Sequence, residues 1–517
     1  MIGLHSLQMI QTTVRLPKDM AKERAVEITP SAAALVESLR GLGYSPETAI
    51  ADLIDNSIAA EAATIELELE WNDGHPQAAL LDDGKGMDRA TAAEALRFGG
   101  TGPSSTRTAG DLGRFGLGPK TASLSQCRQL TIMSRTAGKT CALVLDVDEI
   151  AKRGWFATEL EALPQHPLAT KLLQLEHGTL VLWDRMDSLG GLSGLEKDAF
   201  YLRLQDIRAH LGMVFHRFLG EDTRRIRILT NERAVKPWDP FQKNHASIIE
   251  MRSERIRYRG SSFEIKPYVL PHRDRFANDA EYEAAGGPGG WNARQGFYVY
   301  RAKRLLVAGS WLGLGGARAW TRDESSRLAR IQVDLPTEMD ADWRIDVRKS
   351  QARPPGALRA RLTAIAEHCR AQAREVFVWR GIGPRTRGQS ASNDPLWIAN
   401  TGPNGTNYRV NRNHPALAAF VNGLTAERKQ FEALLTLIEQ SVPVERIWLD
   451  ISEAQGAPVP SMDDEQLEQL TGSLTELAKL LPPTFSAAER VDLLLRHLPQ
   501  PSARLRNHLL EILGAAA

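Results

Sequence analysis

Two neighbouring strand patterns of different kinds restrict the possible folds of this chain more than any other feature. Ile65, Leu67 and Leu69 alternate with glutamates, which is typical of a strand with one buried face. After the turn Asn72–Gly74, the run Ala78–Leu81 is apolar throughout and predicts a buried strand. We expect further strands nearby at residues 130–134, 142–147 and 179–183.

Helical patterns precede these strands. Thr29-Pro30 can cap a helix that runs to about Arg40, and Ser45-Pro46 can begin a second one that runs to about Ala60. The first third of the chain is therefore expected to be an α+β domain, with helices on one face of a mixed sheet. A second set of strands is expected at residues 224–230, 255–258, 263–269, 297–300 and 331–335.

The sequence after Pro415 is mostly helical in pattern. Two apolar stripes occur at helical spacing: Phe431, Leu434, Leu435 and Ile438, and Leu467, Leu470, Leu474 and Leu477. Such stripes are usually packed in a core, and the alternative is a surface that binds a second copy or a partner.

Composition excludes several classes of protein. Of the 517 residues, 42% are hydrophobic and 25% charged, so most of the chain is not disordered. No apolar run approaches the roughly 18 residues of a membrane span, and no secretory signal is visible. The three cysteines lack metal-binding spacing. We expect a cytoplasmic protein without membrane segments.

Polar residues that can carry chemistry occur first in the helix 49–59. Asp52 and Asn56 are one turn apart, with Asp55 beside them and apolar residues on the opposite face. A carboxylate and an amide oxygen in this arrangement can orient a water molecule and ligate a hard cation such as Mg²⁺. Taken alone, the pattern is more typical of an ordinary polar helix face.

Asp82-Asp83-Gly84-Lys85-Gly86-Met87 follows directly on the buried strand. A carboxylate at a strand end can accept hydrogen bonds from an exocyclic amine, and glycines let the backbone approach a flat ligand. Taken alone, it would be a tight strand–loop turn. Calcium binding fits worse, because the acidic spacing of an EF-hand is absent.

Two glycine-rich elements follow. Gly113, Gly116, Gly118 and Lys120 nearly form a Walker A loop, but Pro119 displaces the lysine and removes a backbone donor. We reject a P-loop and keep a flexible segment that opens a helix at residues 121–126, whose N–H groups suit polyphosphate. The last element is Gly178-Thr179, at the start of a predicted strand.

In this order, the four elements resemble the GHKL ATPase superfamily of gyrase, heat-shock-90 chaperones, histidine kinases and MutL, over about residues 29–185. The resemblance implies a Bergerat-type nucleotide fold that binds ATP and Mg²⁺. Asp52 falls at the position of the general base, and Asn56 at that of the Mg²⁺ ligand. Asp82 would hold the adenine amino group; further nucleotide contacts are implied for Gly84, Gly86, Met87, Gly113, Gly116, Gly118, Lys120 and Thr179.

Two departures from the family pattern bear on activity. Asp52 stands where the superfamily usually has glutamate, and Ala59 where many relatives have aspartate. The shorter side chain draws the carboxylate back by roughly 1.5 Å. Because a general base contributes about 10²–10⁴ in rate, we expect an ATPase that is slow.

The sequence after the ATPase elements favours particular branches of the superfamily. Topoisomerases and MutL have a second domain that returns a lysine to the γ-phosphate, and Lys349 in the segment 342–350 is similar in placement. Residues 215–218, 227–232, 238–241 and 297–306 resemble prokaryotic MORC-type ATPases. A histidine kinase is disfavoured, because His5 is the only histidine before Asp52.

The MORC resemblance implies an ATP-dependent homodimer that closes on double-stranded DNA, in bacteria often within an anti-phage or restriction-like system with a separate nuclease or helicase effector. From Arg344 to Arg387 there are eleven basic residues against three acids, a candidate phosphate-contacting surface or simply a solvated helix face. Alternatives are a heat-shock-90-like chaperone, or a nucleotide-binding scaffold that hydrolyses little and recruits an effector.

The resemblance also implies a division into three domains. Residues 1–235 would form the GHKL ATPase domain with an N-terminal segment, residues 236–390 a transducer-like domain of ribosomal S5-like α/β fold, and residues 391–517 a mostly helical C-terminal domain.

Overall fold

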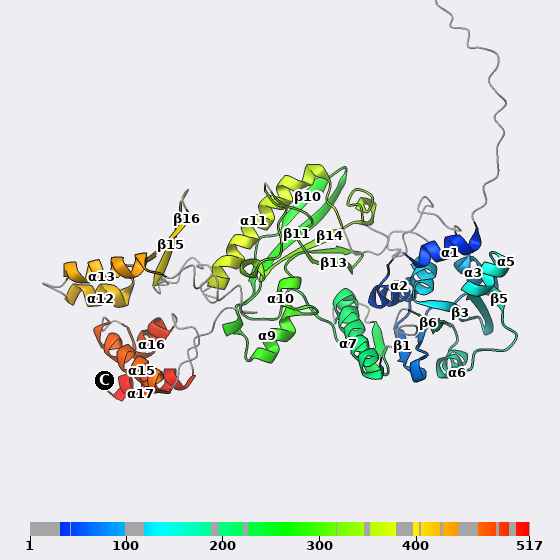
Figure 1. Cartoon of the computed structure of the whole chain (residues 1–517), viewed down its shortest axis with the longest axis horizontal. Coiled ribbons are helices and arrows are strands. Elements are labelled where there is room, and N and C mark those ends of the chain that lie inside the picture. Colours follow the sequence, from blue (N-terminus) through cyan, green and yellow to red (C-terminus); the bar gives the residue numbers. More distant parts are fainter. Residues whose placement is uncertain are drawn as a thin grey trace, which may run out of the picture. The chain divides into compact units, whose positions relative to one another are not determined.

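The computed structural model describes residues 31–41, 43–98, 118–187, 196–220, 226–316, 318–345, 352–378, 396–402, 405–423, 428–442, 464–481, 485–495 and 503–515. By its internal contacts the chain divides into two compact units. Figure 1 shows their helices and strands, labelled where there is room. The first comprises Met1–Leu211 and Phe218–Lys236, and the second comprises Gly212–Arg217 and Pro237–Ala517. The three-domain division expected from the sequence stays a prediction.

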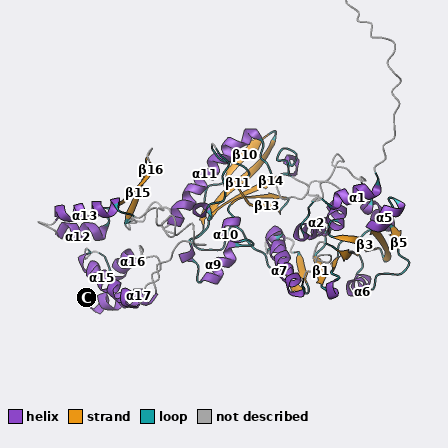
Figure 2. Ribbon diagram, viewed as in Figure 1, coloured by secondary structure: helices purple, strands orange, loops and turns teal. Residues whose placement is uncertain are grey.

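The first unit is built on an eight-stranded sheet of order β5-β4-β3-β6-β2-β1-β7-β8. Of these strands, β1, β3 and β5 are labelled in Figure 2. Its strands are β1 (Thr64–Glu70), β2 (Gln77–Asp82), β3 (Cys127–Thr136), β4 (Lys139–Asp146), β5 (Thr158–Glu159), β6 (Gly178–Met186), β7 (Arg227–Thr230) and β8 (Arg233–Ala234). Strands β1 and β7 are parallel, and the other neighbours are antiparallel, so the sheet is mixed as expected.

Helices cover both faces of this sheet. Helix α4 (Gly118–Leu124) packs on α1 (Ala32–Arg40) and α2 (Pro46–Ala59). Helix α3 (Arg89–Leu96) lies beside β4, and α5 (Val147–Arg153) lies beside β3 and β4. Helix α6 (Pro167–Gln174) instead packs on the opposite face, over β2, β3 and β6. The expectation of helices on one face only was therefore wrong.

The apolar run in β2 explains the second helical layer. Ala79 and Leu81 point toward α6 and share a buried cluster with its Leu168 and Leu172, whereas Leu80 faces α2 across a cavity. A strand that is apolar at every position must be covered on both sides. In β1, by contrast, the glutamates lie on the α6 face, where Glu66 pairs with Lys171 of α6.

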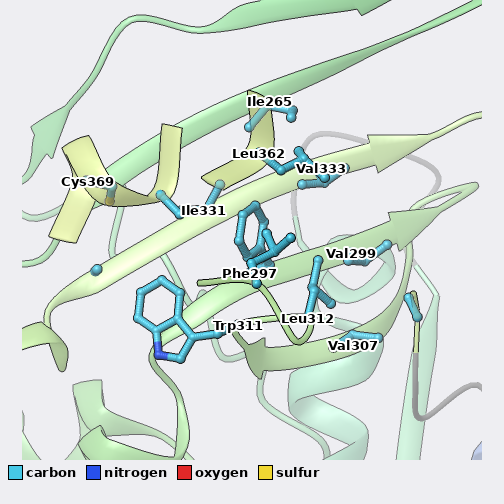
Figure 3. Packing of buried hydrophobic residues seen from close by; sticks show 14 of the residues in the cluster. Ile265, Phe297, Val299, Val307, Trp311, Leu312, Ile331, Val333, Leu362 and Cys369 are labelled. Carbon is cyan, nitrogen blue, oxygen red and sulfur yellow. The ribbon is translucent and has the colours of Figure 1, made fainter. Parts of the chain in front are cut away.

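The second unit contains a sheet of order β10-β11-β14-β12-β13, with β9 also paired to β11. These strands are β9 (Ile249–Glu250), β10 (Glu254–Tyr258), β11 (Ser261–Val269), β12 (Gly296–Arg301), β13 (Arg304–Ser310) and β14 (Ala329–Leu335). Helix α11 (Gly356–Val378) lies on one face, and its Leu362 and Cys369 pack over Ile331 and Val333 (Figure 3). Shorter helices are α9 (Asp279–Gly286) and α10 (Gly290–Ala293), while the end of α7 (Lys197–Val214) and the start of α8 (His216–Leu219) also belong here.

Strand β13 was not predicted from the sequence. It pairs with β12 through the turn at Ala302 and Lys303, which have φ angles of 45° and 71°. Two consecutive positive φ values are typical of a type I′ hairpin turn, whose usual signal is Asn or Gly. Because neither residue is present, the sequence carries no local sign of the hairpin.

Further along the second unit, a hairpin precedes several helices. Strands β15 (Trp397–Gly402) and β16 (Gly405–Val410) are followed by α12 (Pro415–Gly423), α13 (Arg428–Gln440), α15 (Asp464–Leu480), α16 (Ala487–Leu495) and α17 (Ala503–Ala515). On α13, Leu435 is buried but Leu434 and Ile438 are exposed among the described residues. None of the helices in the described ranges is long and apolar enough to cross a membrane.

Candidate functional site

A cavity of about 350 Å³ lies between α2, α3 and α4 and the face of the first unit's sheet that they cover. Its apolar wall comes from Leu53, Leu80, Leu130, Ile132 and Val181, and its polar wall from Asn56, Ser57, Asp82, Lys85, Lys120 and Thr179. A largely apolar cavity with a few polar groups at its margin is the usual form of a small-molecule site.

The register of three strands places a row of polar side chains at the floor of the cavity. Asp82 of β2 is opposite Thr179 of β6, which is opposite Ser134 of β3. Residues directly opposite one another project from the same face of a sheet. All three are buried. Two residues along each strand, the same face of the sheet carries the apolar residues Leu80, Val181 and Ile132.

Asp82 is held by hydrogen bonds on both carboxylate oxygens. The Ser57 hydroxyl on α2 donates to Oδ2 at 2.8 Å, and the Gly84 amide donates to Oδ1 at 2.9 Å. Burial raises the pKa of the Asp82 carboxyl group to about 6, although these hydrogen bonds oppose the rise. Asp82 is therefore mostly ionised at neutral pH, in a place where an ion is poorly solvated.

The adjacent Asp83 has a different role. Its Oδ1 accepts hydrogen bonds from the backbone amides of Ala63 at 2.7 Å and Thr64 at 2.9 Å, at the start of β1. Of the two neighbouring aspartates, only Asp82 lies on the cavity wall.

The glycines after Asp82 are required by the protein's own backbone. At Gly86, with φ +65°, an added Cβ would lie 2.0 Å from the carbonyl oxygen of Arg135. At Gly84 it would lie 2.8 Å from the Cβ of Ala60 and 2.9 Å from Oδ1 of Asp82. From the sequence, we expected glycine at these positions to allow a flat ligand to approach closely. In the structure, glycine is needed because β2, α2 and β3 pack tightly here.

Helix α2 presents Asn56 to the cavity. The N-cap Ser45 accepts a hydrogen bond from Thr48 N, and Pro46 starts the helix. The Asn56 Nδ2 donates to the backbone oxygen of Asp52 at 2.8 Å, which orients the amide and directs its Oδ1 away from that bond.

Asp52 and Asp55 are almost fully buried, at 4% and 2% exposure, so α2 has no solvated polar face of the kind first considered. As far as the described residues form the cavity, its wall includes Asn56 but not Asp52.

Lys120 of α4 reaches the cavity from the other side. It is buried, its Nζ donates to the backbone oxygen of Arg97, and it lies 5.8 Å from the centre of the Phe98 ring. Burial lowers the pKa of its ammonium group. A cation in such a place favours an anionic ligand.

Other residues singled out from the sequence have different placements. Met87 and Gly86 lie on the cavity wall, whereas Gly84 lies behind Asp82, and Gly118 begins α4. Gly113, Gly116 and Lys349 lie outside the described residues.

Three residues around the cavity had no role in the sequence interpretation. Ser57 hydrogen-bonds to Asp82, and its spacing of four from Leu53 could have placed it on the same helix face. The His177 Nδ1 lies 2.7 Å from the Gly84 carbonyl oxygen, and Ser134 contacts Thr179. The sequence gives no sign of the last two, because both contacts depend on strand register.

A second group of potential metal ligands, Glu68, Glu70 and His166, lies on the other face of the sheet. The His166 Nδ1 accepts a hydrogen bond from Leu168 N at 3.1 Å, which leaves the proton of a neutral ring on Nε2. Nε2 is the atom that faces Glu68, and a metal ion would need it deprotonated. This group is therefore a poor metal site.

Part of the chain matches a known protein family. Residues 44–179 match the family described as histidine kinase-, DNA gyrase B-, and HSP90-like ATPase. This region is a GHKL-type ATPase domain. The GHKL domain contains all of the polar residues that line the cavity, among them Asn56, Asp82 and Lys120.

A MORC protein is among the relatives of this chain. ATPase morc-1 of Caenorhabditis elegans is 31% identical over 100 residues, which are 19% of this chain and 11% of the relative. The chain thus spans about a tenth of the length of this relative.

In the segment 344–387, Arg361 and Arg370 have acidic partners within the second unit. Arg361 pairs with Glu254 at 2.6 Å. Arg370 pairs with Asp323 at 2.8 Å and lies 4.7 Å from the ring centres of Trp311 and Trp320. Among the described residues of the segment, the exposed arginines are Arg344, Arg353, Arg359, Arg361 and Arg374.

Proposed function

We propose that the GHKL domain binds ATP in the cavity, with adenine against Asp82. The observation that carries this proposal is the buried, hydrogen-bonded carboxylate of Asp82 on the floor of an apolar cavity. A carboxylate accepts about four hydrogen bonds, and Ser57 and Gly84 supply two. An exocyclic amine of a flat base would satisfy the part of the carboxylate that faces the cavity.

The residues on α2 fit a Mg²⁺ ion bound with the phosphates. Mg²⁺ prefers oxygen ligands and keeps several of its waters, so one protein oxygen is enough to hold it beside a nucleotide. The Asn56 Oδ1 is the ligand we assign, because its Nδ2 is already committed to Asp52 O. The ion would neutralise phosphate charge and polarise the terminal phosphate.

Hydrolysis would follow from positioning by the protein's own groups. We propose that Asp52 orients the attacking water and accepts its proton, and that Lys120 holds phosphate oxygens from the opposite wall. We further propose that Gly113, Gly116 and Gly118 contact the phosphates through their backbone, and that Lys349 approaches the γ-phosphate. The shorter Asp52 side chain favours slow turnover.

A second function, a nucleotide-gated scaffold with little hydrolysis, is favoured by one observation. A general base must come within reach of the proton that it removes, and Asp52 is 4% exposed and is not part of the described cavity wall. Such a protein would bind ATP tightly and recruit an effector in its bound state.

At the level of the whole chain, we propose a MORC-like, ATP-dependent homodimer that acts on double-stranded DNA, with a separate nuclease or helicase effector in an anti-phage system. The sequence match to a MORC ATPase supports this branch. The exposed arginines of the segment 344–387 supply the phosphate contacts in this proposal.

Phosphate release by the purified protein, measured together with ATP binding, tests the proposal. An ATPase predicts release that requires Mg²⁺ and is lost in Asp52→Asn while binding remains. A scaffold predicts binding without release in the wild type. Absence of ATP binding would contradict both. Light scattering with ADP and with a non-hydrolysable ATP analogue tests the dimer, which should form only with the analogue.

A further inference from the structure

The strand β10 forms one edge of the sheet in the second unit. Among the described strands it pairs only with β11, in antiparallel orientation. The short strand β9 continues the same edge, because it pairs with β11 farther along. Within the described sheet, a row of backbone N–H and C=O groups on the outer side of this edge is therefore left unpaired. Such an edge can accept one more strand.

A bulge separates β9 from β10 along the edge. In β9, Glu250 pairs with Tyr268, and in β10, Glu254 pairs with Ile265. The edge therefore advances by four residues, 250 to 254, where β11 advances by three, 268 to 265. One extra residue in an edge strand is a β-bulge, which bends the strand locally.

A groove of about 430 Å³ lies at this bulge, between the edge and helix α11. Its floor is apolar and includes Ile249 and Met251 of the edge and Ile365 of α11. All three pack against the core of the second unit but are only half-buried. The groove thus offers apolar contacts that the described residues of this chain do not fill.

Three arginines along the edge have no acidic partner. Arg252 lines the groove, and Arg255 and Arg257 are exposed on β10. Between the last two, Ile256 belongs to the core under α11, so the two arginines project from the opposite face of the sheet. None of the three forms an ion pair in the described part of the chain.

We propose that this edge binds an extended segment of a partner protein in which acidic and apolar residues alternate. Beside β10, such a segment would form backbone hydrogen bonds with the open edge, and its side chains would alternate between the two faces of the sheet. The apolar side chains would enter the groove on the α11 side. The acidic ones would meet Arg255 and Arg257 on the other side. This interaction does not depend on the ATP site.

The groove and its charges favour a peptide over a nucleic acid. An apolar floor gives no contact to a phosphate backbone, and two carboxylates, Glu250 and Glu254, stand on the rim of the groove. Charged side chains on an edge strand also discourage chance pairing. Because the unpaired charges of β10 are all positive, a basic strand would be repelled and an acidic one attracted.

The test uses designed peptides and the full chain without nucleotide. The main probe is a fluorescent peptide of alternating glutamate and valine, about nine residues long, the length of an ordinary strand. By fluorescence anisotropy we expect a dissociation constant on the order of 10–100 µM, because the contact is small. A second probe with methyl groups on its backbone nitrogens keeps the side chains but cannot donate to the edge. It should bind at least about tenfold more weakly.

Two variants test the two faces of the added strand. Reversing both charges, in Arg255→Glu with Arg257→Glu, should weaken binding of the glutamate probe at least about tenfold and allow the matching lysine probe to bind. Ala364→Trp fills the groove and should weaken binding at least about fivefold. Ala371→Trp is the matched control, because Ala371 is exposed on the same helix outside the groove lining. Thermal unfolding checks that each variant is folded.

Several results would overturn the proposal. Equal affinity for the methylated probe would exclude strand addition, and unchanged affinity in the charge-reversed variant would exclude the arginines. A wild type that does not bind the glutamate probe would also contradict it. If that variant instead loses affinity for a short DNA duplex, the arginines contact nucleic acid rather than a peptide. None of these results bears on ATP binding, which is measured separately.

Discussion

Adjacent residues in this site have unlike roles because of where their side chains point. Asp82 faces the cavity and is bound by Ser57 and Gly84, while Asp83 holds the amides that begin β1. The sequence could identify Asp82 as a candidate from its place at a strand end. It could not predict the contacts of Ser134 or His177. The amide that donates to Ser134 belongs to Met87, 47 residues earlier in the chain, and only the strand register brings the two together.

The pH dependence of base selectivity follows from the Asp82 carboxyl group. Burial raises its pKa to about 6, so it is an acceptor above that pH and becomes protonated below it. We predict that the ratio of ATP to GTP affinity is constant above about pH 7 and falls by up to about tenfold per unit below pH 6. Using the ratio cancels the titration of the phosphates. A ratio unchanged between pH 5 and 8 would contradict the assignment.

Asn56 is predicted to act through the metal ion. The Asn56→Ala variant removes the amide oxygen that we assign to Mg²⁺ and should reduce ATP affinity in Mg²⁺ by about tenfold or more. In excess EDTA the variant and the wild type should bind ATP alike, which is the internal control. An equal loss in both conditions would show that Asn56 contacts the nucleotide or supports α2 instead.

At the scale of elements, the sequence patterns predicted the positions of the strands better than they predicted which faces of the sheet the helices cover. The alternation in β1 and the apolar run in β2 gave both strands near their observed bounds. Because the run in β2 is apolar at every position, both faces of the strand must be covered. Helix α6 covers the second face. The β12–β13 hairpin could not be predicted, because its turn adopts positive φ without Asn or Gly.

Two glycines with similar backbone angles allow a matched test of packing between elements. Gly86 has φ +65° and no room for a Cβ, whereas Gly138 has φ +75° and nothing within 4 Å of that position. Gly138→Ala should cost about 1 kcal/mol from backbone strain alone. Gly86→Ala adds a backbone clash and should cost on the order of 3–5 kcal/mol in free energy of unfolding. Chemical denaturation measures both; equal costs would contradict the packing described here.

At the scale of the whole molecule, the basic segment 344–387 carries the proposed DNA contacts. Arg361 and Arg370 have acidic partners, so we leave them out of the fourfold variant. Changing Arg374, Arg380, Arg385 and Arg387 to Glu should reduce the slope of log affinity against log salt by about three to four. The Arg361→Gln variant serves as a control that should leave the slope unchanged. An unaltered slope in the fourfold variant would place the DNA surface elsewhere.

The central claim, that the buried carboxylate of Asp82 binds the base of ATP, is tested most directly by calorimetry on two adjacent variants. Asp82→Asn and Asp83→Asn make the same chemical change at neighbouring positions, and only Asp82 lines the cavity. The account predicts that Asp83→Asn binds ATP as the wild type does, while Asp82→Asn loses at least about tenfold in affinity and most of its preference over GTP. Equal ATP affinity in the two folded variants would contradict it.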